Sequence, residues 1–420
     1  MAQPLIRPDG VVDGTVPAPP SRRLLGPAAL VSVAYLGANA LAYVFTVLAA
    51  RLLAPAAFGE LAALLGVLLV GTVPATGLQT AAALHLGGTP NGRTTAVLAR
   101  LHAAALVTAL VVVATGVLAA GPLTALLHLP DAGAVVWLVA LLLPSTLVSG
   151  YQGILQGTGR YGRLAAVNGF LGLAKLVGGT AGLVVGGTPT AALAGMTVAA
   201  ALVGWLCCGR PGLSRGLRAP LAAALRASGA LLGFVLLLNL DLLLARHHLT
   251  AVHAGEYAVG AIVAKVAFWL PQGVGVVLLP RLADETHRRQ VLPAALALVG
   301  GVGAVLALAV AALGSAALPL VGGSAYGDAL RSATWLFACL GTLLALAQLL
   351  LYSGIAASDR LAVGAVWGAA AIEAVAVAVL SATGRLSVVG LAVTALLTAL
   401  LLVSFGLLRS RQGRPVLPGG

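Results

Sequence analysis

Residues 50–61 read ARLLAPAAFGEL, and residues 245–257 read ARHHLTAVHAGEY. In each stretch an Ala-Arg pair ends one apolar run and a Gly-Glu pair opens the next. Arg51 matches Arg246 at an offset of 195 residues, and Gly59 matches Gly255 at an offset of 196. A corner that recurs at this distance predicts a chain made of two halves with the same design.

Two further matches extend the repeat. Pro74 matches Pro271 at an offset of 197, and the RLA that begins at Arg163 matches the RLA at Arg360 at the same offset. The matches keep their order along the chain, which favours a duplication. The alternative is that Ala- and Leu-rich helical bundles resemble one another without one.

The repeat divides the chain into segments. We predict an N-terminal half over 25–208 and a C-terminal half over 222–408, joined by a cytoplasmic linker over 209–221, GRPGLSRGLRAPL. The Pro-rich residues 1–24 and the residues 409–420 are expected to be tails, the first of them disordered.

Composition places the chain in a membrane. Of its 420 residues 60% are hydrophobic and only 8% are charged, whereas soluble domains carry roughly 25% charged residues. So few charges cannot cover a surface that faces water. The sequence therefore predicts an integral membrane protein.

Twelve segments are long enough to span a bilayer, which takes about 20 apolar residues. No cleavable signal peptide is expected, because the first apolar run continues as a full span. The predicted spans are 25–50, 58–84, 98–121, 132–156, 164–187, 189–207, 222–245, 255–280, 291–314, 332–355, 361–382 and 387–408.

The basic residues orient these spans. Eighteen arginines fall on one side of the predicted membrane, and four fall on the other: Arg51, Arg246, Arg331 and Arg385. Cytoplasmic loops carry the excess of Lys and Arg, so we expect both termini in the cytoplasm. The net charge of +13 is then mainly a topology signal, and nucleic acid is not an expected partner. The scarcity of lysine suggests a GC-rich bacterial genome, and we expect the chain in the bacterial inner membrane.

Familiar catalytic and metal motifs are absent from the sequence. Cys207, Cys208 and Cys339 form no metal or disulfide pattern, and the histidine-rich corner at 247–256 lacks His-Glu-x-x-His spacing. No Gly-Lys-Ser/Thr phosphate loop is present. We therefore expect no enzymatic activity and no cofactor. The energy for the protein's activity is expected to come from a gradient or a partner.

Polar side chains line one face of three predicted spans. Residues four apart share a helix face, and such stripes point either to a wet cavity or to bonds between helices. The stripes are Tyr35, Asn39 and Tyr43; Ser145, Ser149, Gln152 and Gln156; and Lys265, Trp269 and Gln272.

Four charges fall inside the predicted spans. Lys175 and Glu373 occupy equivalent positions of the two halves, at an offset of 198 and roughly 18 Å from the cytoplasmic end. Asp241 and Lys265 lie at similar depths near the other end. Lysine suits phosphate binding as a point charge, and a buried acid suits ion exchange. Alternatively, Asp241 and Lys265 form a structural pair.

Prolines interrupt two matched spans. Proline removes a backbone hydrogen bond and bends a helix. Pro74 and Pro271 are therefore candidate hinges about which the halves rock, or else sites of a static kink.

Three stretches resemble a known family. These are residues 39–70, NALAYVFTVLAARLLAPAAFGELAALLGVLLV, together with 145–168 and 238–265. They are similar to bacterial polysaccharide-unit flippases of the multidrug/oligosaccharidyl-lipid/polysaccharide exporter superfamily. That family usually has Gly-Pro where this chain has Ala54-Pro55.

The resemblance implies a fold and an activity. The implied fold is all-α and MATE-like, with 12 transmembrane helices in two parallel six-helix repeats. The implied activity is alternating access that moves a lipid-linked (polyprenyl pyrophosphate) oligosaccharide from the inner to the outer leaflet for surface polysaccharide biosynthesis. Membrane lipids and polysaccharide assembly proteins are the other expected partners.

Residue roles follow as hypotheses. The candidate substrate contacts are Tyr35, Asn39, Arg51, Gln152, Lys175, Arg246 and Lys265. Some superfamily members hold Na⁺ on matching helices, so a coupling H⁺ or Na⁺ is assigned to Asp241, Glu373, Thr394 and Thr398. Arg51 and Arg246 either contact phosphate at the exit or anchor the chain to lipid head groups.

Other functions compete with this one. An ion-coupled drug or toxin exporter has the same architecture, and a peptidoglycan-precursor flippase usually has two more C-terminal helices. A membrane-embedded sugar polymerase or ligase usually needs a larger outer loop than the sequence offers. A scaffold without transport activity in a polysaccharide assembly complex is the last alternative.

Overall fold

The computed structural model describes residues 25–88, 95–208, 217–270, 285–326, 330, 333–356 and 359–412. These residues form helices joined by short connections, and no strand occurs among them. The helices of the N-terminal half are α1 (Leu25–Leu52), α2 (Pro55–Gly71), α3 (Val73–Gly88), α4 (Thr95–Leu126), α5 (Gly133–Gly157), α6 (Tyr161–Gly186) and α7 (Pro189–Cys207).

The C-terminal half is built in the same way. Its helices are α8 (Arg218–His248), α9 (Ala251–Trp269), α11 (Glu285–Leu313), α12 (Ala317–Gly322), α13 (Trp335–Ala356), α14 (Arg360–Ala382) and α15 (Val388–Gln412). A short 3-10 turn over Gly314–Ala316 separates α11 from α12.

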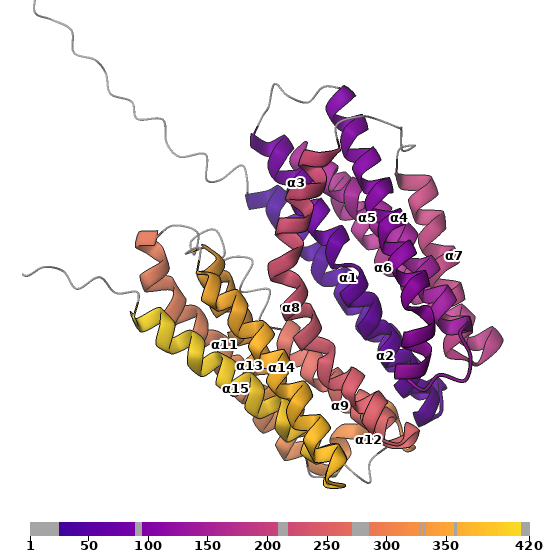
Figure 1. The fold of residues 1–420 in the computed structure, drawn as a ribbon, viewed down its shortest axis with the longest axis vertical. Coiled ribbons are helices and arrows are strands. Elements are labelled where there is room, and N and C mark those ends of the chain that lie inside the picture. The colour runs from indigo at the N-terminus through magenta and orange to yellow at the C-terminus, as the bar shows by residue number, and fades with distance from the viewer. Residues whose placement is uncertain are drawn as a thin grey trace, which may run out of the picture.

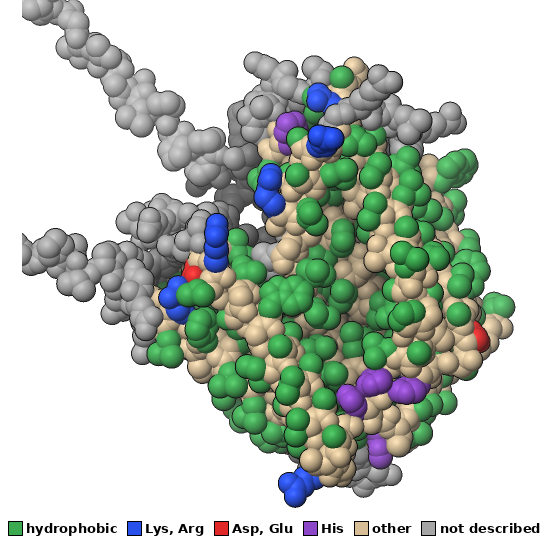
Figure 2. Space-filling view, in the orientation of Figure 1, with side chains coloured by type: hydrophobic (Ala, Val, Ile, Leu, Met, Phe, Trp, Pro, Cys, Tyr) green, Lys and Arg blue, Asp and Glu red, His purple; other side chains and the backbone are tan. Residues whose placement is uncertain are grey.

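Twelve segments of the described chain are long and apolar enough to cross a bilayer, one for each predicted span. Two of them are composite: α2 with α3, and α11 with α12. This confirms the predicted fold class, an all-α multi-pass membrane protein with twelve spans. Hydrophobic side chains cover the sides of the molecule, and most of the visible Lys and Arg side chains gather towards its upper left (Figure 2).

Several predicted boundaries move by a few residues. α8 begins at Arg218, within the predicted linker, and α15 continues to Gln412, within the predicted C-terminal tail. Residues 1–24 and 209–216 lie outside the described residues.

Local chemistry explains how the helices begin. Pro55 opens α2 at a position where its missing N–H is not needed. The matching helix α9 begins instead with a side-chain cap, because Thr250 Oγ1 accepts a hydrogen bond from the His253 N–H. The repeated corner therefore keeps its shape with different chemistry in each half.

The second predicted span contains the proline break that the sequence indicates. Helix α2 ends at Gly71, Thr72 lies between the two helices, and α3 carries Pro74 in its first turn. Pro74 has no N–H to donate to the carbonyl of Val70, four residues back, which accounts for an interruption at this point. Pro271 and Gln272 lie outside the described residues. A hinge at either proline stays a prediction.

Small residues hold neighbouring spans together. Gly178 and Gly182 of α6 face Gly195 and Ala191 of α7, so closely that a Cβ on either α6 glycine would meet backbone of α7. Because lipid is as apolar as leucine, close backbone packing replaces hydrophobic burial as the main attraction between membrane helices. The Gly-rich sequence of these helices is what permits this packing.

Apart from α8, the helices of the two halves meet at one end of the bundle and diverge towards the other (Figure 1). We call the meeting end the corner end; there α1 and α8 end, and α2 and α9 begin. We call the opposite end, where α1 begins and α15 ends, the termini end. α2 packs along α9, and α8 crosses between the halves, with Asn239 against Gly66 and Ser228 against Gly77.

Candidate functional site

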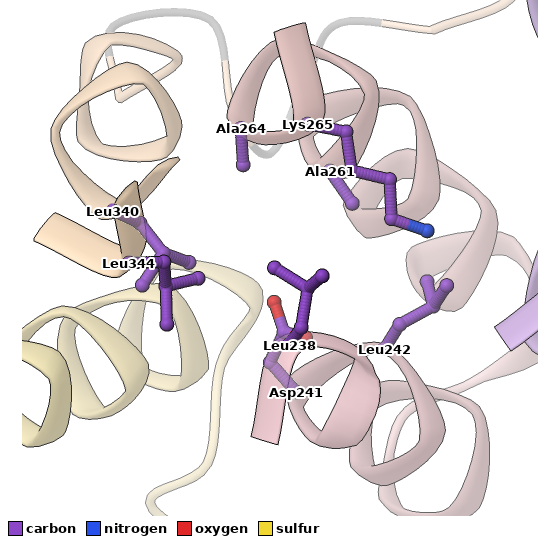
Figure 3. A pocket seen from close by; sticks show the side chains of 8 residues that line it. All are labelled: Leu238, Asp241, Leu242, Ala261, Ala264, Lys265, Leu340 and Leu344. Atoms are coloured by element: carbon purple, nitrogen blue, oxygen red, sulfur yellow. The ribbon is translucent and has the colours of Figure 1, made fainter. Parts of the chain in front are cut away.

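Two intramembrane charges of the C-terminal half line one small cavity. Asp241 of α8 and Lys265 of α9 face a space of about 10 Å³ that Leu340 and Leu344 of α13 close on another side (Figure 3). This volume is about that of a single water-sized sphere. No ion pair within 4.0 Å joins the two charges in the described structure. Asp241 and Lys265 therefore lie at one cavity, in keeping with their similar predicted depths, but they do not form a direct ion pair.

The direct partner of Asp241 is a tyrosine. Tyr257 of α9 donates a hydrogen bond of 2.8 Å from its hydroxyl to Asp241 Oδ2, and its ring packs edge-on against Phe337 of α13. Asp241 is 7% exposed and Tyr257 is fully buried. We did not predict Tyr257 from the sequence, although it lies two helical turns before Lys265 and therefore on nearly the same face of α9.

A second acid lies beside this pair. Glu373 of α14 is 2% exposed and close enough to interact electrostatically with both Asp241 and Tyr257. Its Oε1 is buried without a hydrogen-bond partner. A buried carboxylate oxygen without a donor is costly, and a proton or a small cation would satisfy it.

The two candidate threonines lie on α15, which packs against both α14 and α8. Thr394 Oγ1 donates to Gly390 O at 2.8 Å, and Thr398 Oγ1 donates to Thr394 O at 2.9 Å. Both hydroxyl protons are thus engaged within the helix, which leaves the oxygen lone pairs as acceptors. Their part in holding an ion stays a prediction.

Charge counting gives the cluster a simple chemical property. Asp241 and Glu373 carry two negative charges when ionised, and Lys265 carries one positive charge. One further monovalent cation, H⁺ or Na⁺, makes the group neutral. Buried charges are tolerated in hydrocarbon only when balanced, so the residues present fit a site that exchanges one cation.

Lys175 is placed differently from its counterpart Glu373. It lies on α6, half-buried, on the face that packs against α1 through the close contacts of Gly172 with Ala38 and Gly179 with Phe45. No acid partner of Lys175 occurs among the described residues. The structure does not bring the two equivalent charges together.

Polar stripes of the N-terminal half make contacts between helices. Gln79 of α3 donates to the Tyr35 hydroxyl at 2.7 Å, and Gln152 of α5 donates to Asn168 Oδ1 of α6 at 3.0 Å. These contacts match the structural alternative for the stripes. Substrate contacts by Tyr35, Gln152 and the half-buried Asn39 stay predictions.

One pair of stripes faces across the two halves. The Tyr43 hydroxyl of α1 lies beside the Trp269 side chain of α9. Tyr43 is the last residue of the predicted stripe that begins at Tyr35, and Trp269 is the second residue of the stripe that begins at Lys265. Polar faces from opposite halves therefore meet in the interior of the bundle.

Arg51 and Arg246 both bind main-chain oxygens. Arg246 is 7% exposed and donates from Nε to Leu127 O at 2.9 Å and from Nη2 to His128 O at 3.2 Å. Arg51 donates from Nε to Val321 O at 3.3 Å and from Nη2 to Leu320 O. Sequence patterns gave no signal for these partners, since backbone carbonyls carry none.

Comparison with known proteins gives a match of fold. No family model and no curated protein matches the sequence. An inward-facing multidrug resistance MATE family transporter of the MOP superfamily matches with a TM-score of 0.66 and 13% identity, over 92% of this chain and 96% of that one. An outward-facing structure of such a transporter matches with a TM-score of 0.60 and 13% identity, over 92% and 94%.

The chain has the MATE transporter fold. A third structure with this fold is a MOP superfamily transporter from Pyrococcus furiosus, described as having a binding pocket of reversed polarity, with a TM-score of 0.59 and 14% identity over 92% of this chain and 95% of that one. Identities this low concern the fold alone.

Proposed function

We propose that the chain is an alternating-access transporter that carries an anionic lipid-linked oligosaccharide across the membrane and exchanges one monovalent cation in each cycle. The corner end is proposed to face outward and the termini end inward, in keeping with the basic residues predicted on the cytoplasmic side.

The arrangement of the two halves supports alternating access. α2 and α9 pack together at the corner end, while α11, α13, α14 and α15 pack mainly within their own half. Apart from α8, which also packs along α3, the two bundles are joined at one end, and such bundles are able to rock about that contact.

The cluster of Asp241, Glu373 and Lys265 supports ion coupling. It is short of one positive charge when both acids are ionised, and Glu373 Oε1 lacks a hydrogen-bond donor. A bound proton or Na⁺ supplies the missing positive charge and gives that oxygen a partner. Release of the ion would leave an unbalanced charge in the bundle. That charge would destabilise the conformation and so favour a change to another one.

The observation that carries the anionic substrate is Lys175. A lysine in the middle of a span without an acid partner among the described residues calls for an anion. A pyrophosphate meets that requirement, whereas a cationic drug would be repelled. Binding pockets of reversed polarity are described for this fold, so an anionic substrate is compatible with it.

Reconstitution tests the proposal. The purified full-length chain is placed in liposomes that contain a fluorescent polyprenyl-pyrophosphate glycan, and loss of fluorescence to an impermeant quencher reports movement between leaflets. We expect movement well above protein-free liposomes that depends on a H⁺ or Na⁺ gradient, with no accumulation of ethidium. Gradient-driven ethidium transport without glycan movement would instead identify a drug exporter.

A further inference from the structure

The two arginines of the repeated corner cross between the halves in a reciprocal manner. Arg51 ends α1 of the N-terminal half and binds Leu320 O and Val321 O of the C-terminal half. Arg246 ends α8 of the C-terminal half and binds Leu127 O and His128 O of the N-terminal half. Each arginine thus uses Nε and Nη2 to hold two consecutive carbonyls of the opposite half.

The acceptors are also equivalent. Leu127 and His128 directly follow the last residue of α4, and Leu320 and Val321 lie in the last turn of α12. The last carbonyls of a helix lack partners within it, and a cation near them interacts favourably with the helix dipole. Both guanidinium groups therefore cap a helix that belongs to the other half.

A histidine strengthens one of the two contacts. His247 follows Arg246, and its Nδ1 lies 2.7 Å from Leu126 O; because a carbonyl only accepts, Nδ1 carries the hydrogen. The His247 ring also stacks on His128, with 5.2 Å between ring centroids. Three consecutive carbonyls at the end of α4 are thus held from α8.

One buried acid and two glycines complete the same layer. Glu60 of α2 is 8% exposed and interacts electrostatically with Arg246. Next to it, Gly59 meets Gly255 of α9 backbone to backbone. The repeated Ala-Arg and Gly-Glu pairs therefore lie together in one layer that closes the corner end.

We propose that Arg51 and Arg246 are a pair of symmetric latches that hold the corner end closed and must release their carbonyls before that end opens. This inference rests on the alternating access proposed above. It replaces a role in phosphate or head-group binding for Arg246, because a side chain 7% exposed with both Nε and Nη2 engaged is not available to lipid.

The test measures the width of the corner end without any substrate. Cys207, Cys208 and Cys339 are first replaced by serine. Spin labels are then attached to the new cysteines of Val185→Cys and Arg385→Cys. Both labelled positions are exposed and lie at the corner end, one in each half. Distances are measured by double electron–electron resonance in the full-length protein in nanodiscs.

We expect the parent protein to show mainly the short distance. In the double variant Arg51→Gln/Arg246→Gln, the longer-distance fraction should rise about tenfold, with Arg51→Lys and Arg246→Lys giving intermediate rises because lysine lacks the two-pronged guanidinium. Arg226→Gln is the matched control, since Arg226 is an exposed arginine on the same helix near the termini end.

Unchanged distances in folded arginine variants would overturn the latch. Where the double variant fails to fold, the single lysine variants decide by the same criterion, and a rise equal to that of Arg226→Gln also counts against it. The measurement uses no glycan and no drug. A wider corner end in the arginine variants would therefore uphold the latch, even where the parent protein moves no glycan in liposomes and the proposed substrate is refuted.

Discussion

Gly59 and Gly255 touch across the boundary between the halves. A Cβ built on Gly59 would lie 2.8 Å from the Gly255 backbone nitrogen, and one built on Gly255 would overlap the carbonyl of Pro55. The two glycines occupy equivalent positions of the repeat, so the duplicated sequence makes contact with its own copy. This contact sets how closely α2 and α9 approach.

Alanine at either glycine should therefore destabilise the protein. The neighbours are backbone atoms that cannot move aside, and overpacking of this kind costs about 1–3 kcal/mol. We expect Gly59→Ala and Gly255→Ala to lower the melting temperature of the purified protein. Gly364→Ala is the control: nothing lies within 4 Å of its added Cβ, so its melting temperature should stay the same or rise. Equal behaviour of all three would refute the close contact.

The spans could be predicted because their signal is local. A run of about 20 apolar residues identifies a membrane helix without knowledge of its neighbours, and all twelve runs became spans in the described structure. The corner was also predictable as a repeat, since Arg51 and Arg246 are visible in the sequence. Pro74 marked the break between α2 and α3 for the same local reason.

The partners of those residues were not predictable. Arg246 binds carbonyls 118 and 119 residues away, and Arg51 binds carbonyls 269 and 270 residues away; every residue type supplies such an acceptor. We did not predict a role for Tyr257, because a tyrosine in an apolar run is usually interpreted as a packing residue. Position along the spans predicted that Asp241 and Lys265 lie at similar depths in the membrane. Only the packing of the helices revealed that Glu373 lies with them and that Lys175 does not.

Removal of either acid should stop ion-coupled transport without loss of protein. Glu373→Gln leaves Asp241 and Lys265 as a balanced pair, and Asp241→Asn leaves Glu373 and Lys265, so neither variant buries a net charge. Neither retains the deficit that binds a cation. We expect gradient-driven glycan movement to fall to the protein-free level, with normal amounts in the membrane. Asp131→Asn, at an exposed position, should transport normally; full activity of both acid variants would refute the coupling role.

Tyr257→Phe should alter the response to the coupling ion. The lost hydrogen bond to Asp241 is 2.8 Å long, and bonds to charged groups are worth about 1.5–3 kcal/mol. Without it the carboxylate holds the cation more tightly, so the ion concentration for half-maximal transport should fall about tenfold. Tyr326→Phe is the control, since its hydroxyl makes only a 3.5 Å contact with Leu53 O. A lower melting temperature with unchanged ion dependence would mean that Tyr257 is purely structural.

The link between Asp359 and Arg409 should make stability depend on pH. Arg409 donates to Asp359 Oδ2 at 2.9 and 3.3 Å, and these bonds hold the pKa of the carboxyl below its usual value. A lowered folded-state pKa means that the stabilisation is complete above the unfolded value of about 3.9 and is lost as the pH falls through the folded-state pKa.

Asp359→Asn isolates this link, because asparagine keeps the oxygen that caps α14 at the Leu361 N–H. We expect a loss of about 0.5 kcal/mol at pH 7, as for exposed ion pairs, which shrinks towards zero as the pH falls below 4. Thermal unfolding at several pH values measures it. Arg409→Gln should lose as much, and the double variant no more than either alone. A pH-independent difference would exclude the ion pair as its source.

Lys175→Met should stabilise the protein and impair its transport. A lysine in the middle of a membrane helix costs about 2.5–3.5 kcal/mol relative to water, and Lys175 has no acid partner in the described structure that would offset this. An apolar side chain of similar length removes the cost, so the melting temperature should rise. If the lysine is retained to bind pyrophosphate, the substrate concentration for half-maximal transport should rise at least about tenfold, and Lys175→Arg should restore part of it. A fall in melting temperature with unaltered transport would identify Lys175 as a packing residue and remove the main support for an anionic substrate.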